Sequence, residues 1–379
     1  MRPAGEYFWQ GNQACVEGAI AAGCKLFAGY PITPSTEIPE LLSKRLPESG
    51  GVFVQGEDEL ASLAMVIGAS QTGWKAMTAT SGPGISLMQE NIGFAAISET
   101  PCVIVDSQRV GTGTGIATKS MQGDVYQVRY GSHGDYSIIA LAPSSPQEMF
   151  DHTIEAFNLA EEYRCPVFVM ADEIVSHMRE NVTVPRPEAL KIVNRRRPES
   201  KEGFAVSRAD SPTGVPPMPA LGEGYGILVS GFVHTETGGP TTSYVETEKF
   251  IKRLWMKIEA NVDRIARLET EAIDDAEAII LSYGSVGRSA QRAARNMREA
   301  GHRVGFVRLI TLWPFPDRMI REACKTAAHV VVPEMNMGKM VREVERVLAG
   351  SAATHLVSKP GVDLHRPSEI EAVVRRLIG

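Results

Sequence analysis

A turn with three carboxylates stands directly before an apolar helical pattern in VFVQGEDELASLAMVIGAS (52–70). Glu57 and Asp58 have the ordinary place of acids at a helix start, where the helix dipole favours negative charge. Glu59 directly precedes Leu60 and a run of small apolar residues, in a helix that looks buried nearly all round. Burial there would favour its neutral form and suit it to proton transfer near neutral pH. A simple capping carboxylate is the alternative.

A threonine between two prolines follows the apolar run 25–29, in the stretch FAGYPITPSTEIPE. Each proline fixes its own φ and keeps the residue before it out of the helical region. Thr33 is therefore expected to be held rigidly at the carboxyl end of a strand, which is where open α/β sheets bind ligands. A merely rigid turn is the alternative.

A second loop that could bind a ligand is TSGPG (80–84), between the apolar run 75–79 and the helical pattern 84–97. Backbone N–H groups at a helix start suit a polar or anionic group, although such glycine-proline turns often only turn the chain. The residues concerned are Ser81, Gly82, Pro83 and Gly84.

The third loop is longer and polar, over 107–135, and carries Arg109, Lys119 and Asp124 among glycines and threonines. Loops of this length in a compact domain are usually functional. Two cations in it would suit a carboxylate or phosphate substrate.

The elements that must position these loops alternate regularly over the first 180 or so residues. Short apolar runs between amphipathic helical patterns predict a mostly parallel, doubly wound α/β sheet, with the three loops at one edge. The predicted strands are 25–29, 51–55, 75–79, 102–106, 136–141 and 166–171, and the predicted helices are 12–23, 35–46, 58–72, 84–97 and 146–163.

The pattern breaks down at about 180–275, where proline, glycine and charge predict an extended linker. Within it, Arg195, Arg196 and Arg197 are expected to be solvated, and a charged surface helix is expected at 244–271. A smaller α/β domain then follows, with strands at 278–285, 303–309 and 329–335 and helices at 287–299 and 338–348. Its turn SYGSVG (282–287) does not complete G-x-G-x-x-G, so a nucleotide site is not favoured.

The composition argues against several classes of function. The 379 residues are 43% hydrophobic with a net charge of −6, which gives no electrostatic argument for nucleic acid or an anionic membrane. Apolar runs of about eight residues are too short to span a bilayer, and the first residues lack the apolar core of a signal peptide. The five cysteines are scattered among apolar residues, which indicates buried thiols in a reducing cytoplasm. Neither they nor the dispersed histidines have metal-ligand spacing, so no metal site is predicted.

Several motifs occur together and in order: GYPITPSTEI, QGEDELASL, ATSGPGISLM, ISETPCVIVDSQRVGTGTG, QGD and, at 306–316, FVRLITLWPFP. With them the sequence resembles the α subunit of the 2-oxoacid:ferredoxin oxidoreductases, most closely the 2-oxoglutarate synthase (KorA-type) branch. The resemblance implies a pyrimidine-binding thiamine-diphosphate domain at 1–185 and a transketolase C-terminal-like α/β domain at 275–379, with a linker and surface helix at 186–274.

The resemblance also implies a shared active site. Thiamine diphosphate would lie between this chain and a β subunit that binds the diphosphate and Mg²⁺ and carries a [4Fe–4S] cluster. Coenzyme A would be the cosubstrate, ferredoxin the electron acceptor, and the assembly an (αβ)2 heterotetramer in the cytoplasm. The sequence has neither a GDG diphosphate motif nor a CxxC pair, in agreement with half of an active site.

Residue roles follow from the same resemblance. Glu59 would contact the pyrimidine ring of the cofactor and control its tautomer, and the Thr33 hydroxyl would bind the 2-oxoacid. Either Arg109 or Lys119 would pair with the substrate carboxylate or coenzyme A. The family often has arginine near position 119, and lysine lacks its bidentate geometry. The implied substrate pocket is Tyr30, Pro31, Ile32, Thr33, Arg109 and Lys119, and the implied cofactor contacts are Glu59, Pro31, Ser81, Gly82, Pro83 and Gly84.

Three alternatives stay open from the sequence. The same reaction could act on pyruvate, indolepyruvate or a branched-chain 2-oxoacid, since the second charge of 2-oxoglutarate requires a cation that the motifs do not identify. The chain could be a non-catalytic thiamine-fold scaffold, although its Glu59, Thr33 and glycine loops argue against this. A Rossmann dehydrogenase is disfavoured because no complete dinucleotide fingerprint follows a strand. The physiological direction is also open.

Overall fold

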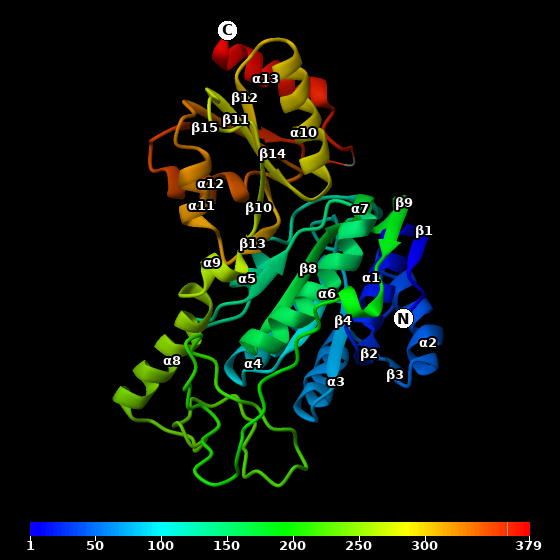
Figure 1. Cartoon of the computed structure of the whole chain (residues 1–379), viewed down its shortest axis with the longest axis vertical. Coiled ribbons are helices and arrows are strands. Elements are labelled where there is room, and N and C mark those ends of the chain that lie inside the picture. Colours follow the sequence, from blue (N-terminus) through cyan, green and yellow to red (C-terminus); the bar gives the residue numbers. More distant parts are fainter. Residues whose placement is uncertain (362) are drawn as a thin grey trace.

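The structure is a computed structural model, and it describes residues 1–361 and 363–379. Two α/β units are joined by a long segment of loops and one prominent helix (Figure 1). The N-terminal unit contains a sheet of eight strands. These strands are β2 (Cys24–Gly29), β3 (Val52–Gln55), β4 (Lys75–Thr80), β5 (Cys102–Val110), β6 (Ile116–Ser120), β7 (Ile139–Leu141), β8 (Pro166–Asp172) and β13 (Thr311–Trp313).

Six of these strands form the parallel centre of the sheet, in the order β7-β8-β5-β4-β2-β3. Its middle strands are almost completely buried, as expected for apolar strands covered on both faces. The helices of this unit are α1 (Gly11–Ala21), α2 (Glu37–Glu48), α3 (Glu59–Gln71), α4 (Gly82–Ile97), α5 (Gln127–Tyr130), α6 (Pro146–Tyr163) and α7 (Glu173–His177).

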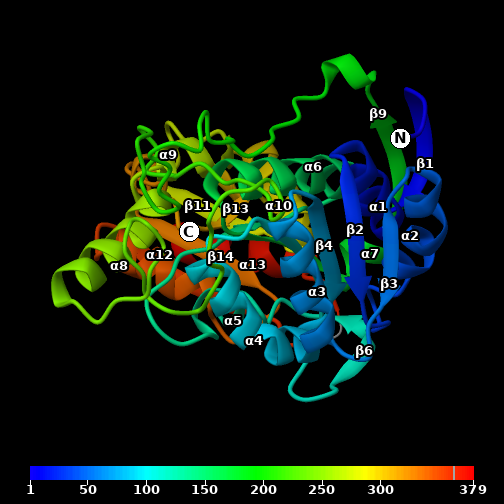
Figure 2. The same ribbon diagram turned by 90° about the horizontal axis from the view of Figure 1, so that it is seen from below.

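The helices cover both faces of the sheet. Helices α1, α2 and α6 share one hydrophobic core, while α3 and α4 belong to a second core on the opposite face. Figure 2 shows α1 and α2 on one side of β2, β3 and β4, with α3 and α4 on the other. The predicted doubly wound α/β fold is therefore confirmed. An additional antiparallel pair, β1 (Gly5–Gln10) with β9 (Arg179–Val184), was not predicted.

The C-terminal unit has a five-stranded sheet in the order β10-β12-β11-β14-β15, parallel except for β10. Its strands are β10 (Leu268–Glu271), β11 (Ala278–Tyr283), β12 (Val304–Leu309), β14 (His329–Glu334) and β15 (Ala353–Ser358). Its helices are α10 (Gly284–Glu299), α11 (Asp317–Ala323), α12 (Met340–Leu348) and α13 (Pro367–Ile378).

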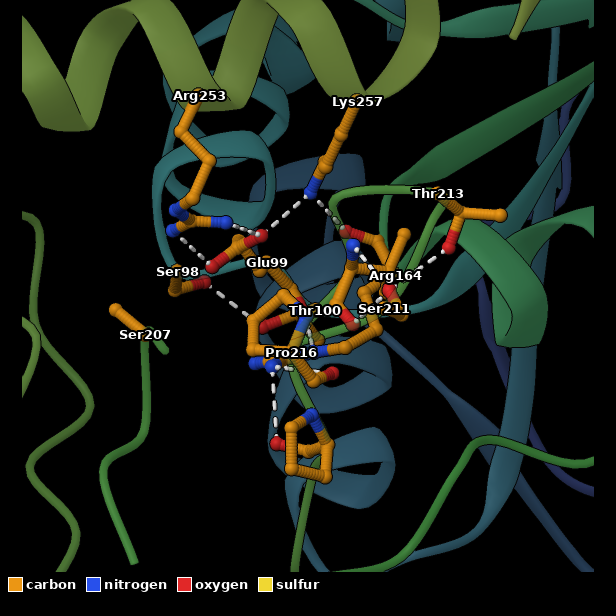
Figure 3. A network of polar contacts seen from close by, with 12 residues as sticks. Ser98, Glu99, Thr100, Arg164, Ser207, Ser211, Thr213, Pro216, Arg253 and Lys257 are labelled. Atoms are coloured by element: carbon orange, nitrogen blue, oxygen red, sulfur yellow. Dashed lines mark hydrogen bonds and ion pairs between the residues drawn. The ribbon is translucent and has the colours of Figure 1, made fainter. Parts of the chain in front are cut away.

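The connecting segment includes the short η1 (Pro187–Ala189), α8 (Tyr244–Glu259) and α9 (Val262–Ile265). Ion pairs hold helix α8 against the N-terminal unit. The buried Glu99 carboxylate accepts hydrogen bonds from Arg253 at 2.7 and 2.8 Å and from Lys257 at 2.8 Å (Figure 3). Burial alone would raise the pKa of Glu99, but Lys257, Arg253 and Arg164 hold it well below its ordinary value.

Three sequence predictions about these elements are wrong. The helix predicted at 244–271 ends at Glu259, because the chain continues through the short α9 and then pairs as β10 with β12. The strand predicted to end at 106 continues to Val110 and forms a hairpin with β6, so the first part of the predicted loop is sheet. Arg195 is buried rather than solvated, since its Nε donates to Glu161 Oε2 at 2.9 Å.

Candidate active site at the carboxyl edge of the first sheet

Glu59 is the first residue of α3, and a neighbouring acid performs the capping. The Asp58 side chain accepts the Ala61 N–H at 2.7 Å, which satisfies the helix end. The capping alternative for Glu59 is therefore wrong. The Glu59 side chain is instead buried, with 4% of the residue exposed, and Thr80 Oγ1 lies 3.5 Å from its Oε1. The long contact leaves most of the hydrogen-bonding capacity of this carboxyl group open.

The SGPG turn begins α4 and lies against two carboxyl groups. A Cβ atom at Gly84 would lie 1.9 Å from Thr80 Oγ1 and 2.6 Å from Glu59 Oε1, so only glycine fits there. A Cβ atom at Gly82 would lie 3.0 Å from Asp124 Oδ2. The turn is thus packed between Glu59 on one side and Asp124 on the other. Within the part of the chain that the structure describes, the buried Ser81 Oγ has no hydrogen-bond partner.

Thr33 and Arg109 are brought together from distant parts of the sequence. Arg109 Nη1 donates to the Thr33 carbonyl oxygen at 2.7 Å, and the arginine is buried, with 8% exposed. Its Nε has no partner among the described residues. Because Thr33 itself is only partly buried, the pair offers a hydroxyl and a guanidinium N–H at one edge of the sheet.

Lys119 is not part of this arrangement. Ser120 is the register partner of Arg109 across the β5–β6 hairpin, and Ser120 is buried. Successive side chains of a strand point to opposite sides, so Lys119 is exposed on the outer side of the hairpin. Tyr30 and Pro31 are also exposed, at the mouth of the same edge.

Sequence reasoning missed a group behind the YPITP turn. Asn12 Nδ2 donates to the Pro34 carbonyl and to Glu37 Oε2, both at 2.8 Å. His177 lies 3.4 Å from Glu37 Oε1 and 2.9 Å from Glu173 Oε1. Hydrogen bonds to Glu173 and then Glu37 raise the pKa of His177 to about 10. These residues come from α1, α2 and α7, and no local motif would have connected them.

A second missed feature is a carboxyl pair. Asp106, fully buried on β5, faces Asp124 of the QGD sequence. Burial, and then the Asp124 charge, raise the pKa of Asp106 well above its ordinary value. Burial raises the pKa of Asp124 to about 6, against lowering contributions from Asp106, Lys339 and Arg109. The sequence signal was Asp106 itself, an acid at the end of an otherwise apolar strand.

The glycine turn before α10 binds an internal anion. Asp172, at the end of β8, accepts the Ser285 N–H at 3.0 Å through its Oδ2. A carboxylate of the N-terminal unit therefore already lies at the helix N-terminus that a nucleotide phosphate would need.

A cavity of about 460 Å³ lies away from these residues, lined among others by Trp255, Trp313 and Arg346. Its lining does not include Glu59, Thr33 or Arg109. Helix α3 meanwhile exposes one face beside Glu59, through Leu60, Ala61, Ala64 and Gly68. The expectation of a helix buried nearly all round is therefore wrong, because only the face that carries Leu63, Val66 and Ile67 packs into the core.

All five cysteines are buried free thiols, as predicted. Among the described residues, no cluster of three or more potential His, Cys, Asp or Glu ligands is present. Over the same residues, no helix is long and apolar enough to cross a membrane.

Comparison with known proteins identifies matches along the whole chain. A family model described as pyruvate flavodoxin/ferredoxin oxidoreductase, thiamine diphosphate-binding, matches residues 17–252. A second, pyruvate:ferredoxin oxidoreductase core domain II, matches residues 276–370. The 2-oxoglutarate synthase subunit KorA of Methanocaldococcus jannaschii is 54% identical, over 97% of this chain and 98% of that protein.

A more distant relative has another substrate in its name. The ketoisovalerate oxidoreductase subunit VorB of Methanothermobacter thermautotrophicus is 37% identical, over 98% of this chain and 97% of its own. Among solved structures, 2-oxoglutarate:ferredoxin oxidoreductase from Magnetococcus marinus, with 2-oxoglutarate, coenzyme A and succinyl-CoA bound, matches with a TM-score of 0.94. That match is 32% identical and covers all of this chain and 66% of the other.

Proposed function

This chain belongs to the pyruvate:ferredoxin oxidoreductase family, and within it we propose that the chain is the catalytic α subunit of a 2-oxoglutarate synthase. The reaction converts 2-oxoglutarate and coenzyme A to succinyl-CoA and CO2, with the electrons passed to ferredoxin. The observation that carries the proposal is the convergence of Glu59, the SGPG turn, Thr33 and Arg109 on one sheet edge. The higher identity to 2-oxoglutarate synthase subunits than to a ketoisovalerate subunit supports the substrate.

The residues at this edge fit the pyrimidine half of thiamine diphosphate. Glu59 offers a buried carboxyl group with open hydrogen-bonding capacity, and Ser81 offers an unpaired hydroxyl within the described residues. Glycine at position 84 keeps the space beside Glu59 Oε1 free of a side chain. The cofactor, when bound, supplies the electron sink that decarboxylation of a 2-oxoacid requires.

The roles of the protein groups follow from their positions. Glu59 holds and moves a proton at its Oε atoms, in a site from which burial excludes water. Arg109 presents a positive charge to a substrate carboxylate, together with an Nε that has no partner among the described residues, while its Nη1 fixes the Thr33 backbone. The Thr33 hydroxyl is held near by the YPITP turn and orients the 2-oxoacid.

The remainder of the site belongs, in this proposal, to a β subunit that binds the diphosphate with Mg²⁺ and carries the [4Fe–4S] cluster. The exposed apolar face of α3 beside Glu59 supports such a partner, because contiguous exposed apolar surface marks interaction sites. Dispersed buried cysteines support placing the redox centre outside this chain. We further propose an (αβ)2 heterotetramer in the cytoplasm.

The test is coenzyme A-dependent reduction of a low-potential dye by the chain copurified with its β partner. 2-Oxoglutarate, pyruvate and 2-oxoisovalerate are compared in the wild type, in Glu59→Gln and in the control Glu57→Gln. Glu57 is exposed on the same turn, so the control should retain full activity. We expect activity on 2-oxoglutarate that falls about 100-fold or more in Glu59→Gln, the scale of a lost acid–base group.

Two results would contradict the proposal. Activity confined to pyruvate or 2-oxoisovalerate would assign the chain to a sister branch of the family. Turnover unchanged by Glu59→Gln would mean that the chain is a scaffold subunit.

A further inference from the structure

The QGD sequence (122–124) lies between the two units of the molecule and contacts both. Gln122, on the loop after β6, has 1% of its surface exposed and is bound almost entirely by the C-terminal unit. Its backbone N–H donates to the Met335 carbonyl at 2.9 Å, and its own carbonyl accepts from Asn336 Nδ2 at 2.8 Å. Its side-chain Oε1 accepts the Met335 N–H at 3.3 Å.

The amide nitrogen of Gln122 completes the connection. Gln122 Nε2 donates to Asp172 Oδ2 at 3.1 Å and to the Tyr283 carbonyl at 3.3 Å. Both Asp172 and the Tyr283 carbonyl lie at the start of α10, where Asp172 also accepts the Ser285 N–H. Every polar group of Gln122 therefore makes a hydrogen bond. Because the residue is also buried, these bonds hold it in a single conformation.

Two residues further along the chain, Asp124 is fixed from the other side. Its N–H donates to Gln108 Oε1 at 3.1 Å, and its carboxyl group lies against Gly82 and Asp106. Asp124 Oδ2 and both Asp106 oxygens have no donor within the described residues. Two carboxylates in such a place cannot both be ionised without strong repulsion, so one shared proton is the arrangement that satisfies them.

We propose that Gln122 is a positioning residue, through which the C-terminal unit holds the Asp106–Asp124 pair, with one shared proton, against the SGPG turn of the active site. Gly82 of this turn contacts Asp124, and Gly84, two residues on, contacts Glu59. Displacement of Asp124 would therefore release the turn that places Glu59. The inference rests on the proposed function for its effect on turnover, but the shared proton is a property of the chain itself.

The charges that face the pair come from both units. Burial raises the pKa of Asp124, while its hydrogen bond with Asp106 and the charges of Lys339, on the loop before α12, and Arg109, on β5, lower it. For Asp106, burial and then the Asp124 charge both raise the pKa. Loosening Gln122 would admit water and separate the two carboxyl groups. The proton would then be lost at a lower pH than in the wild type.

The test compares Gln122→Ala with the control Arg308→Gln. Arg308 joins the same two units by donating to Glu148, but its bonds do not involve the QGD loop. Infrared absorption of protonated carboxyl groups is measured against pH on the full chain, with Asp106→Asn used to assign the signal. The pH profile of kcat/KM for 2-oxoglutarate is measured on the complex with the β partner.

We expect a protonated-carboxyl signal that Asp106→Asn removes. In Gln122→Ala its midpoint, and the matching limb of the kcat/KM profile, should fall by about one pH unit or more, since Asp106 would be less buried and would lose the nearby Asp124 charge, both of which raise its pKa. Arg308→Gln should change neither, even if it lowers Tm equally. Absence of the signal in the wild type, an unmoved midpoint in Gln122→Ala, or an equal movement in Arg308→Gln would overturn the inference. A complex inactive on 2-oxoglutarate would refute the proposed function alone, because the infrared titration needs no substrate.

Discussion

Residues that carry the same charge have different roles at this site because their local geometry differs. Asp58 has an extended backbone and caps α3, whereas Glu59, one residue later, is the first helical residue and points into the protein. Arg109 and Lys119 differ in the same way, since one is buried against Thr33 and the other is exposed on a hairpin. The structure thus favours Arg109 as the group that meets a substrate carboxylate.

The choice between the two cations gives a direct prediction. Arg109→Lys should lower kcat/KM for 2-oxoglutarate about 10- to 100-fold, because lysine cannot bond the Thr33 carbonyl and a substrate carboxylate with one planar group. Lys119→Ala is the matched change of a cation in the same hairpin and should alter kcat/KM less than about threefold. Steady-state kinetics of the complex measure both. A large loss in Lys119→Ala with little loss in Arg109→Lys would reverse the assignment.

The YPITP turn is positioned by three helices rather than by its prolines alone. Asn12 of α1 holds the Pro34 carbonyl, and Glu37 of α2 is held in turn by Asn12 and by His177 of α7. Burial alone would raise the pKa of Glu37, but hydrogen bonds from His177 and its neighbours lower it to about 2. This arrangement makes the stability of the turn depend on pH at both ends of the range.

Removing the histidine should expose that dependence. The raised pKa of His177 means that its stabilisation is complete below its unfolded value near 6.5 and is lost as pH rises toward about 10. The lowered pKa of Glu37 means that its share is complete above about 4.5 and is lost as pH falls toward about 2. The difference in free energy of unfolding between wild type and His177→Ala should therefore be largest at about pH 4.5–6.5. Because His177 is 29% and Glu37 35% exposed, it should be only about 1 kcal/mol.

Thermal unfolding of the full chain across pH measures this difference. His133→Ala is the control, since the His133 side chain is 84% exposed and lies no closer than 3.7 Å to Glu90, which is 74% exposed. A difference that stays constant from pH 5 to pH 9 in His177→Ala would show that the histidine contributes no charge to the turn.

Elements with a strong local signal could be predicted from the sequence, and elements formed by distant pairing could not. Apolar runs such as 75–79 and 102–106 are strands because the alternating helices bury both of their faces. The β5–β6 hairpin has a glycine- and threonine-rich tip without an apolar pattern, so composition predicted a loop. Residues 268–271 form β10 by pairing with the edge of β12. Arg195 can be buried because the Glu161 carboxylate binds its guanidinium group.

The same limit applies to the candidate site. Glu59, Thr33 and the SGPG turn carried local signals, as did Asp106 as an acid within an apolar run. The pairing of Asp106 with Asp124, the bonds of Gln122 and the His177 group depend on contacts between residues far apart in the sequence. The sheets do not follow the predicted boundaries: β13, from the C-terminal half of the sequence, pairs with β7 of the first sheet, and β10 of the second sheet precedes the predicted domain start at 275. The division at 1–185, 186–274 and 275–379 stays a prediction.

At the scale of the whole molecule, the exposed face of α3 should determine assembly. Ala64 is exposed on that face beside Glu59, so Ala64→Glu leaves the core of the chain unchanged and puts a charge where we propose that the β subunit binds. We expect the Tm of the isolated chain to change by less than about 1 °C, while copurification with the β subunit and turnover are lost. Val245→Glu, on the exposed surface of α8, should affect neither. Normal assembly of Ala64→Glu would place the partner on another surface, and the Glu59 site would then have to be completed without α3.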